Sequence, residues 1–324
     1  MNRLFATTLL LSASALTMVP AAVAQQYPAR PVTIIVPYAA GGATDLLARY
    51  AAQGLTTAFG SSVVVENKPG ASGLVGTTLV ARAQPDGYTL LASSSATTVN
   101  GALSKTLPFN VRNDFIPIGM IGWGDVAILT NKALPVKTLA EFIEYAKARP
   151  GALNFGTAGK GTGAHLSALE FMGQTGIKAT HVPYSGSSAV LTGLVGGQVD
   201  FAVDVPGGYA EYVKRGDVRA LVVTGPERSH LMPDVPTVKE AGYPTLAYTF
   251  MIGLMAPAKT PAAVIEKVRS ELWSVTRQPE VQKRMLGLNF KPDDGARGSF
   301  EKLISDDLSY YERVGSERGF KLED

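Results

Sequence analysis

The sequence predicts an α/β protein of two lobes, each built on a mostly parallel sheet flanked by helices. Short apolar runs alternate with amphipathic helical stretches, separated by brief turns rich in glycine and proline, which is typical of such sheets. A strand that passes through a glycine-rich bend into a helix occurs twice, at 33–45 and at 153–163. A chain of 324 residues is also long enough for two domains.

The composition excludes several classes of site. Hydrophobic residues make up 46% of the chain and charged residues 18%, which suits a globular protein rather than a disordered one. The formal net charge is only +3 and the chain has no Lys/Arg run, so we expect no nucleic-acid partner. Cysteine is absent, and the three histidines form no close pair in the sequence. We therefore expect no disulfide, no metal site and no cofactor.

Residues 1–24 have the features of a signal peptide. Arg3 supplies a positive charge, an apolar stretch covers 4–19, and Ala22-Val23-Ala24 is a small-x-small cleavage site. The alternative is a membrane anchor, but the stretch is short and Pro20 interrupts it. We expect cleavage after Ala24 and an exported, soluble mature protein.

The first strand is expected at 33–36, before a bend and a helix from Thr44 to about Phe59. Unpaired N–H groups at a helix start, with the positive end of the helix dipole, favour an anion. The alternative is a plain tight turn. Asp45 is expected to pair with Arg49 at i+4 rather than to touch a ligand. The predicted ligand contacts of this first loop are Tyr38, Ala39, Ala40, Gly41, Gly42 and Thr44.

Further strands are expected at 63–65 and 88–92, with a helix at 73–83 between them. Ser94 and Ser95 follow the carboxyl end of the third strand, where parallel α/β sheets place their ligands. Their hydroxyls are predicted to bind the ligand, and the alternative is simple capping of the next turn.

Apolar runs at 115–121 and 125–130 come next, and the second is predicted to cross into another lobe. A helix is expected at 138–148. The second glycine-rich loop then precedes a helix on which His165 is expected to be structural. The predicted contacts of this second loop are Thr157, Ala158, Gly159, Lys160, Gly161 and Thr162.

Three more polar residues follow strands of this second lobe. Tyr184 and Ser187 lie at the start of another helix and are predicted to complete the far wall, although Tyr184 is also a candidate for packing only. Asp204 follows a strand at 199–203 and is a candidate for holding a bridging water or a ligand amine, or for capping the next helix. The Lys160 ammonium is either a partner for a second ligand carboxylate or a solvated loop residue.

The remaining chain contains a buried strand at 218–224 and an irregular stretch at 226–247. The apolar run 249–256 is predicted to return to the first lobe. Helices are expected at 261–277, 280–286 and 300–318.

Taken together in their order, these stretches resemble the Bug/TctC family, the periplasmic solute-binding components of tripartite tricarboxylate transporters. The resemblance spans essentially the whole mature chain. It departs from the family at Lys160, where small polar residues are usual, and in the loop after Asp204. The stretches that carry it are YPARPVTIIVPYAAGGATDLLAR, VVENKPGASGLVGT, PDGYTLL, LPVKTLAEFIEYAKARPGALNFGTAGKGTGAHLSALEF, HVPYSGSSAVLTGLVGGQVDF, MPDVPTVKEAGYP and GLMAPAKTP.

The resemblance implies a type II-like periplasmic binding protein fold with one cleft between the lobes. Lobe 1 would comprise 25–127 and 248–324, and lobe 2 would comprise 128–247. It also implies a periplasmic monomer that binds a small carboxylate through backbone amides, hydroxyls and water, and then engages a membrane permease. Family ligands range from aliphatic, tricarboxylic, aromatic and amino-acid carboxylates to neutral molecules, and we expect a dicarboxylate.

The two alternatives are a sensor role and an enzymatic role. A ligand-presenting partner of a membrane sensor kinase would have the same cleft. An enzyme is disfavoured because the chain has no G-x-S-x-G, H-E-x-x-H or G-x-x-x-x-G-K-[ST] motif.

Overall fold

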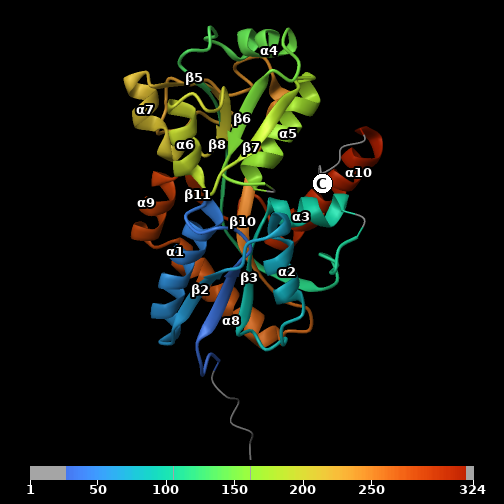
Figure 1. Cartoon of the computed structure of the whole chain (residues 1–324). Helices are drawn as coiled ribbons and strands as arrows, with labels where there is room; N and C mark the ends of the chain where they lie inside the picture. Colours follow the sequence, from blue (N-terminus) through green and yellow to red (C-terminus); the bar gives the residue numbers. More distant parts are fainter. Residues whose placement is uncertain (1–26, 105, 161, 319–324) are drawn as a thin grey trace, which may run out of the picture.

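The strands of this chain form two separate sheets flanked by helices (Figure 1). The computed structural model describes residues 27–104, 106–160 and 162–318, so the predicted signal peptide at 1–24 lies outside the described residues. The strand order is β11-β4-β10-β3-β1-β2 in the first sheet and β7-β6-β8-β5-β9 in the second. The α/β class and the paired sheets predicted from the sequence are confirmed.

The first sheet draws its strands from both ends of the chain. Its central helix α1 buries Leu47, Ala51 and Leu55 on one face, as the helical spacing predicts, and Gly60 ends it in a left-handed conformation. The strands are β1 (Val32–Val36), β2 (Val63–Asn67), β3 (Thr89–Ser94), β4 (Phe115–Gly124), β10 (Phe250–Pro257) and β11 (Phe290–Pro292). The helices are α1 (Ala43–Phe59), α2 (Leu74–Ala81), α3 (Ser95–Leu103), α8 (Ala262–Thr276), α9 (Pro279–Gly287) and α10 (Phe300–Arg318).

The second sheet comes from the middle of the chain. Three fully buried aromatic rings fill its core, and Phe201 lies 5.0 Å from Phe142 and 5.4 Å from Phe155, measured between ring centroids. The strands are β5 (Ala127–Asn131), β6 (Leu153–Thr157), β7 (Ala179–Pro183), β8 (Phe201–Asp204) and β9 (Val218–Val223). The helices are α4 (Leu139–Lys147), α5 (Gly163–Thr175), α6 (Ser187–Val195) and α7 (Ala210–Arg215).

The expectation of mostly parallel sheets is wrong in one respect, because both sheets are mixed. The β2-β1-β3 and β7-β6-β8 portions are parallel, whereas β10 runs antiparallel to β3 and β4, and β5 runs antiparallel to β8 and β9. The reason is the way the chain changes sheets. β5 and β10 each follow a segment by which the chain crosses between the sheets. Each begins at the edge of its sheet where the parallel strands end, so it runs in the opposite direction to them.

Hydrogen bonds at Thr224 connect the segments by which the chain crosses between the two sheets. Its N–H donates to the Val126 carbonyl at 2.8 Å, and its hydroxyl donates to the Tyr248 carbonyl at 2.8 Å. The Val126 N–H donates back to the Thr224 hydroxyl at 3.1 Å. A rotation of one sheet against the other would therefore be concentrated in these few residues.

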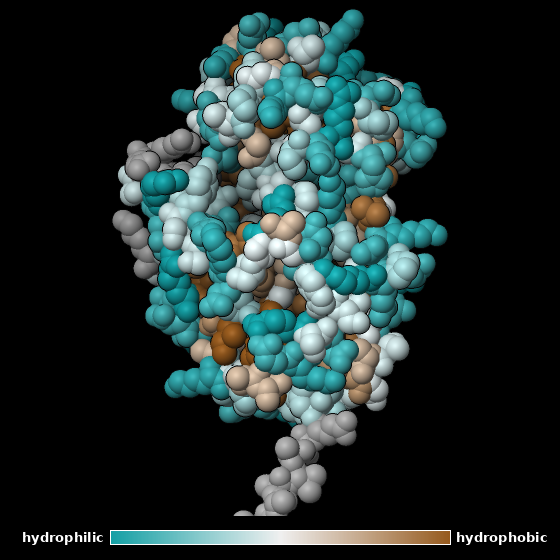
Figure 2. All heavy atoms as spheres, turned by 180° about the vertical axis from the view of Figure 1, so that it is seen from behind, coloured by the Kyte–Doolittle hydropathy of each residue, from teal (hydrophilic) through white to brown (hydrophobic). Residues whose placement is uncertain are grey.

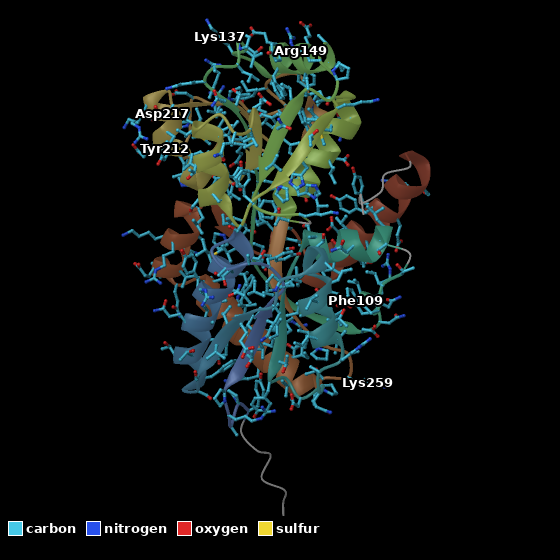
Figure 3. All side chains as sticks on the ribbon, in the orientation of Figure 1. Phe109, Lys137, Arg149, Tyr212, Asp217 and Lys259 are labelled. Atoms are coloured by element: carbon cyan, nitrogen blue, oxygen red, sulfur yellow. The ribbon has the colours of Figure 1, made fainter. Side chains whose placement is uncertain are left out.

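The outer surface is mostly polar. In Figure 2 the described residues on the back face are largely hydrophilic, and hydrophobic groups are scattered in small clusters. Lys137 and Arg149 lie at the far end of the second sheet and Lys259 lies at the far end of the first (Figure 3). Within residues 27–104, 106–160 and 162–318, no helix combines the length and apolarity needed to cross a membrane.

Candidate functional site

A cavity of about 50 Å³ lies where the two sheets meet. Its walls come from the loops that follow β1, β3, β6, β7 and β8, and from the start of β10. The carboxyl ends of parallel strands thus face it from both sides, as in other open α/β sheets. The lining residues are Tyr38, Ala39, Gly42, Ala43, Thr44, Asp45, Ser94, Ala158, Thr162, Gly163, Ala164, Gly186, Ser187, Asp204, Val205 and Phe250.

The structure brings together many of the predicted contact residues. Those that line the cavity are Tyr38, Ala39, Gly42, Thr44, Ser94, Ala158, Thr162, Ser187 and Asp204. Those that lie outside its lining are Ala40, Gly41, Ser95, Thr157, Gly159, Lys160 and Tyr184. Gly161 falls outside the described residues.

The first loop presents the uncapped start of α1. The first-turn N–H groups of any α-helix have no intrahelical acceptor. The N-cap residue here is Gly42, and no side chain caps the helix there to accept from them. Asp45 is 2% exposed and forms the predicted ion pair with Arg49 at 2.9 Å. Its carboxylate also accepts from the Gly41 N–H at 2.9 Å. Burial favours the neutral acid, but the Arg49 guanidinium and the Gly41 N–H outweigh it and hold the pKa of Asp45 below its usual range.

Tyr38 and Ser94 meet at the floor of the cavity, with their hydroxyl oxygens 3.0 Å apart. Burial raises the pKa of Tyr38 to about 12, so its phenol remains neutral. Ser94 also caps α3 by accepting from the Ala96 N–H at 3.3 Å. Its hydroxyl therefore both caps a helix, which was the alternative role, and lines the cavity.

The second loop presents the start of α5. Thr162 caps this helix by accepting from the His165 N–H at 3.3 Å, and its hydroxyl donates to the Gly159 carbonyl at 2.8 Å. Behind the loop, the His165 ring stacks on His181 with centroids 4.1 Å apart. Burial lowers the pKa of His165 to about 3 and that of His181 to about 4, so both rings are neutral at pH 7. This packing fits the structural role expected for His165.

A third helix start, that of α6, completes the wall. No side chain caps α6 at Gly186, and the Ser187 hydroxyl donates to Asp204 at 2.9 Å. Asp204 is 1% exposed and also accepts from the Val205 N–H at 2.8 Å and the Tyr209 hydroxyl at 2.9 Å. Both carboxylate oxygens are thus engaged by the protein itself.

The Tyr184 side chain does not line the cavity. A Cβ on Gly193 would lie 2.3 Å from the Tyr184 hydroxyl, and one on Gly156 would lie 3.1 Å from its ring. The ring therefore packs between α6 and β6, which matches the packing alternative. The predicted contacts did not include seven further lining residues, although the glycine-rich helix starts indicated the region of most of them. These are Ala43, Asp45, Gly163, Ala164, Gly186, Val205 and Phe250.

The pKa of Asp204 gives a testable dependence of stability on pH. Burial raises this pKa to about 6, so between about pH 4 and pH 6 the folded state binds more protons than the unfolded state. Relative to Asp204→Asn, the free energy of unfolding of the wild type should therefore fall by about 1.4 kcal/mol for each unit by which the pH rises in that window. The difference should be constant above pH 7. Urea titrations of both proteins at several pH values measure it, and a difference that is flat from pH 4 to pH 8 would contradict the burial argument.

The arrangement suits an anion without cationic side chains. The starts of α1, α5 and α6 converge on the cavity, and each contributes backbone N–H groups and the positive end of a dipole. Among the described lining residues there is no lysine or arginine. No group of three potential metal ligands occurs among the described residues.

Comparison with known proteins places this geometry in context. The TctC family, "Tripartite tricarboxylate transporter family receptor", matches residues 47–320. Protein BugT of Bordetella pertussis is 33% identical over 100% of this chain and 99% of its own length. MatC of Rhodopseudomonas palustris, solved with bound malate, is 32% identical with a TM-score of 0.82 over 89% of this chain and 99% of that one. A second R. palustris protein, solved with adipate, is 29% identical with a TM-score of 0.81 over 90% of this chain and 98% of that one.

Proposed function

Since this chain belongs to the TctC family, the receptors of tripartite tricarboxylate transporters, we propose that it captures a small dicarboxylate and delivers it to a membrane permease. The observation that carries this proposal is the convergence of three helix starts, from both sheets, on one cavity without a cationic side chain. Malate and adipate, found in the two R. palustris relatives, are both dicarboxylates. The protein acts as a binding protein and not as an enzyme.

Capture requires the lobes to move. The cavity of about 50 Å³ is much smaller than the roughly 300–1,000 Å³ typical of small-molecule sites. A dicarboxylate therefore enters when the lobes separate and is enclosed when they return. It stabilises the closed form because only that form brings helix starts from both lobes to it, and the permease reads the closed form.

The proposal includes the mature form of the protein. The predicted signal peptide is cleaved after Ala24 and the protein works in the periplasm as a monomer. Lobe 1 then comprises 25–127 and 248–324, and lobe 2 comprises 128–247. The two sheets support this division except at Ala127, which begins β5 of the second sheet, because every strand between Ala127 and Val223 belongs to that sheet.

A thermal-shift screen of the mature protein tests the function. The protein is unfolded and refolded to remove any carried ligand, and then mixed with aliphatic, tricarboxylic and aromatic acids. A ligand at 100 times its dissociation constant adds roughly 2.7 kcal/mol, which moves the midpoint by several degrees. No shift with any acid would reject the carboxylate proposal.

Substitution of two threonines that cap helices, one at the cavity and one away from it, tests whether the ligand binds in the cavity. Thr162 caps α5 at the cavity, whereas Thr138 caps α4 by accepting from the Glu141 N–H at 3.2 Å and lies outside the lining. Thr162→Ala should reduce the shift caused by the best acid, and Thr138→Ala should leave it intact. Equal loss in both variants would place the ligand elsewhere.

Lys160 gives a prediction about ligand charge. This exposed lysine lies on the second loop, just before the start of α5 and outside the cavity lining, and we propose that its ammonium attracts a second ligand carboxylate. Lys160→Ala should weaken binding of a dianion roughly fivefold more than binding of the matched monoanion, since exposed charge pairs are weak. Calorimetry with both ligands measures the ratio, with Lys137→Ala at the far end of the second sheet as control (Figure 3). Equal effects on both anions would remove Lys160 from the site.

A further inference from the structure

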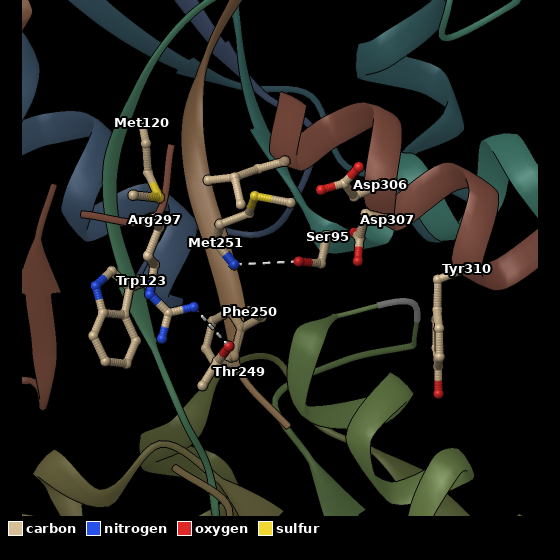
Figure 4. Close-up of a pocket in the computed structure, with 11 residues that line it drawn as sticks. Ser95, Met120, Trp123, Thr249, Phe250, Met251, Arg297, Asp306, Asp307 and Tyr310 are labelled. Carbon is tan, nitrogen blue, oxygen red and sulfur yellow. Dashed lines mark hydrogen bonds between the residues drawn. The ribbon is translucent and has the colours of Figure 1, made fainter. Parts of the chain in front are cut away.

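A second, larger cavity of about 230 Å³ lies between α10 and the strands β4 and β10. Figure 4 shows Trp123 and Arg297 on one side of it and Asp306, Asp307 and Tyr310 of α10 on the other. Its lining differs from that of the first cavity except for Phe250. The function proposed above makes no use of it.

The charged group on the first side is Arg297. Its guanidinium carbon lies 3.6 Å from the centroid of the Trp123 ring, and Nη1 donates to the Thr249 hydroxyl at 3.2 Å. Partial burial lowers the pKa of Arg297, and the charge of the Asp294 carboxylate opposes this shift without reversing it. Among the described residues no carboxylate forms an ion pair with it. A guanidinium held on an aromatic face with free N–H groups is a typical receptor for a carboxylate.

The opposite wall carries the opposite charge. Asp307 accepts a hydrogen bond from the Thr98 hydroxyl, and burial raises the pKa of Asp307 to about 6. Asp306 forms an exposed ion pair with Lys302. A simple anion bound to Arg297 would face these acids across the cavity, whereas a ligand with a positive group at its other end would be attracted by them.

The cavity also has several apolar lining residues. Met120, Met251 and Leu303 line it, and methionine side chains adapt to ligands of irregular shape. The cavity is smaller than the sites of drug-sized ligands, which occupy roughly 300–1,000 Å³. Its occupant is therefore small, with an apolar body between its two charged groups.

We propose that this second cavity binds an ω-amino carboxylate, whose apolar chain separates a carboxylate on Arg297 from an ammonium towards Asp306 and Asp307. The site is separate from the proposed dicarboxylate site and does not depend on it. The competing explanation is that Arg297 only fixes the loop before α10 by stacking on Trp123.

Tryptophan fluorescence reads this cavity directly. The chain has two tryptophans, so Trp273→Phe leaves Trp123 as the reporter. In this background we expect a saturable change in emission with 6-aminohexanoate. Hexanoate lacks its ammonium and hexylamine lacks its carboxylate, so each should bind roughly tenfold more weakly. No saturable response to 6-aminohexanoate would overturn the proposal.

Substitutions of the charged lining residues test whether they cause the fluorescence response. Arg297→Gln should weaken binding of 6-aminohexanoate roughly tenfold, and Asp307→Asn should narrow the difference in affinity between 6-aminohexanoate and hexanoate. The matched control is Arg149→Gln, because the Arg149 guanidinium carbon lies 3.9 Å from the centroid of the Tyr145 ring, outside the cavity lining, and its loss should leave binding unchanged. Near-UV circular dichroism checks that each variant is folded.

A substitution in the first cavity tests whether the amino acid binds there instead. Ser187→Ala alters only the dicarboxylate cavity, so it should leave the amino-acid response intact. If Ser187→Ala abolishes the response while Arg297→Gln retains it, the amino acid binds between the lobes and the second site is rejected.

Discussion

Alanine in place of Gly163 should weaken binding of the dicarboxylate at least tenfold, which is about 1.4 kcal/mol. A Cβ at Gly163 would lie 2.8 Å from Cγ and 2.9 Å from Cδ2 of Phe250. The Phe250 ring is 5% exposed and packs edge-on against Phe290 at 5.3 Å, so it has little room to retreat. Gly163 opens α5 of the second sheet and Phe250 opens β10 of the first. The added methyl group would therefore hold the lobes apart.

The same helix supplies the control for this substitution. Gly173 also lies in α5, but a Cβ there would meet nothing within 4 Å. Gly173→Ala should keep full affinity and gain about 0.5–1 kcal/mol of stability from helix propensity. Calorimetry of both variants with the best acid from the screen makes the comparison. Wild-type affinity in Gly163→Ala would show that this contact between the lobes is not needed for binding.

A second substitution separates lobe closure from damage to α5. Phe250→Ala in the Gly163→Ala background removes the ring that the methyl group would strike. The double variant should recover part of the lost affinity, since the two changes share one contact and are not additive. No recovery would indicate that the methyl group disturbs the helix start itself.

The local units of this fold were predictable because each is encoded in a short stretch. A strand, a glycine-rich bend and an amphipathic helix are adjacent in sequence around Gly42 and around Thr162, and the bends were correctly expected at the helix starts. Those starts also line the cavity between the sheets. Sequence reasoning thus located the loops of the site without knowledge of the sheet order.

The long-range features were not predictable in the same way. The antiparallel neighbours β3 and β10 pair Ser94 with Ile252, which lie far apart in the chain, and no local pattern specifies that pairing. The three-residue strand β11 and the helix α3, which starts at Ser95, were not predicted at all. Tyr184 illustrates the limit for side chains, because its direction is fixed by the space over Gly156 and Gly193.

The buried carboxylate of Asp45 supports the first loop without being a predicted ligand contact. Besides Arg49 and Gly41, it accepts from Asn67 Nδ2 at 2.9 Å, and the same amide donates to the Tyr38 carbonyl at 3.0 Å. One carboxylate thus links the loop, the helix α1 and the end of β2. Asp45→Asn replaces two acceptor oxygens by one oxygen and one donor, so at least one of these donors loses its partner.

Asp45→Asn should cost about 2 kcal/mol of stability, because a buried donor loses its acceptor, and it should weaken ligand binding roughly tenfold. The surface pair of Arg30 and Asp86 supplies the control, since both side chains are largely exposed and Asp86→Asn should change stability by less than about 0.5 kcal/mol. Urea titration and calorimetry measure the two quantities separately. A loss of stability with unchanged affinity would mean that the loop from Tyr38 to Gly42 only connects β1 to α1. A loss of both would mean that Asp45 holds the backbone donors of α1 in the geometry that the ligand requires.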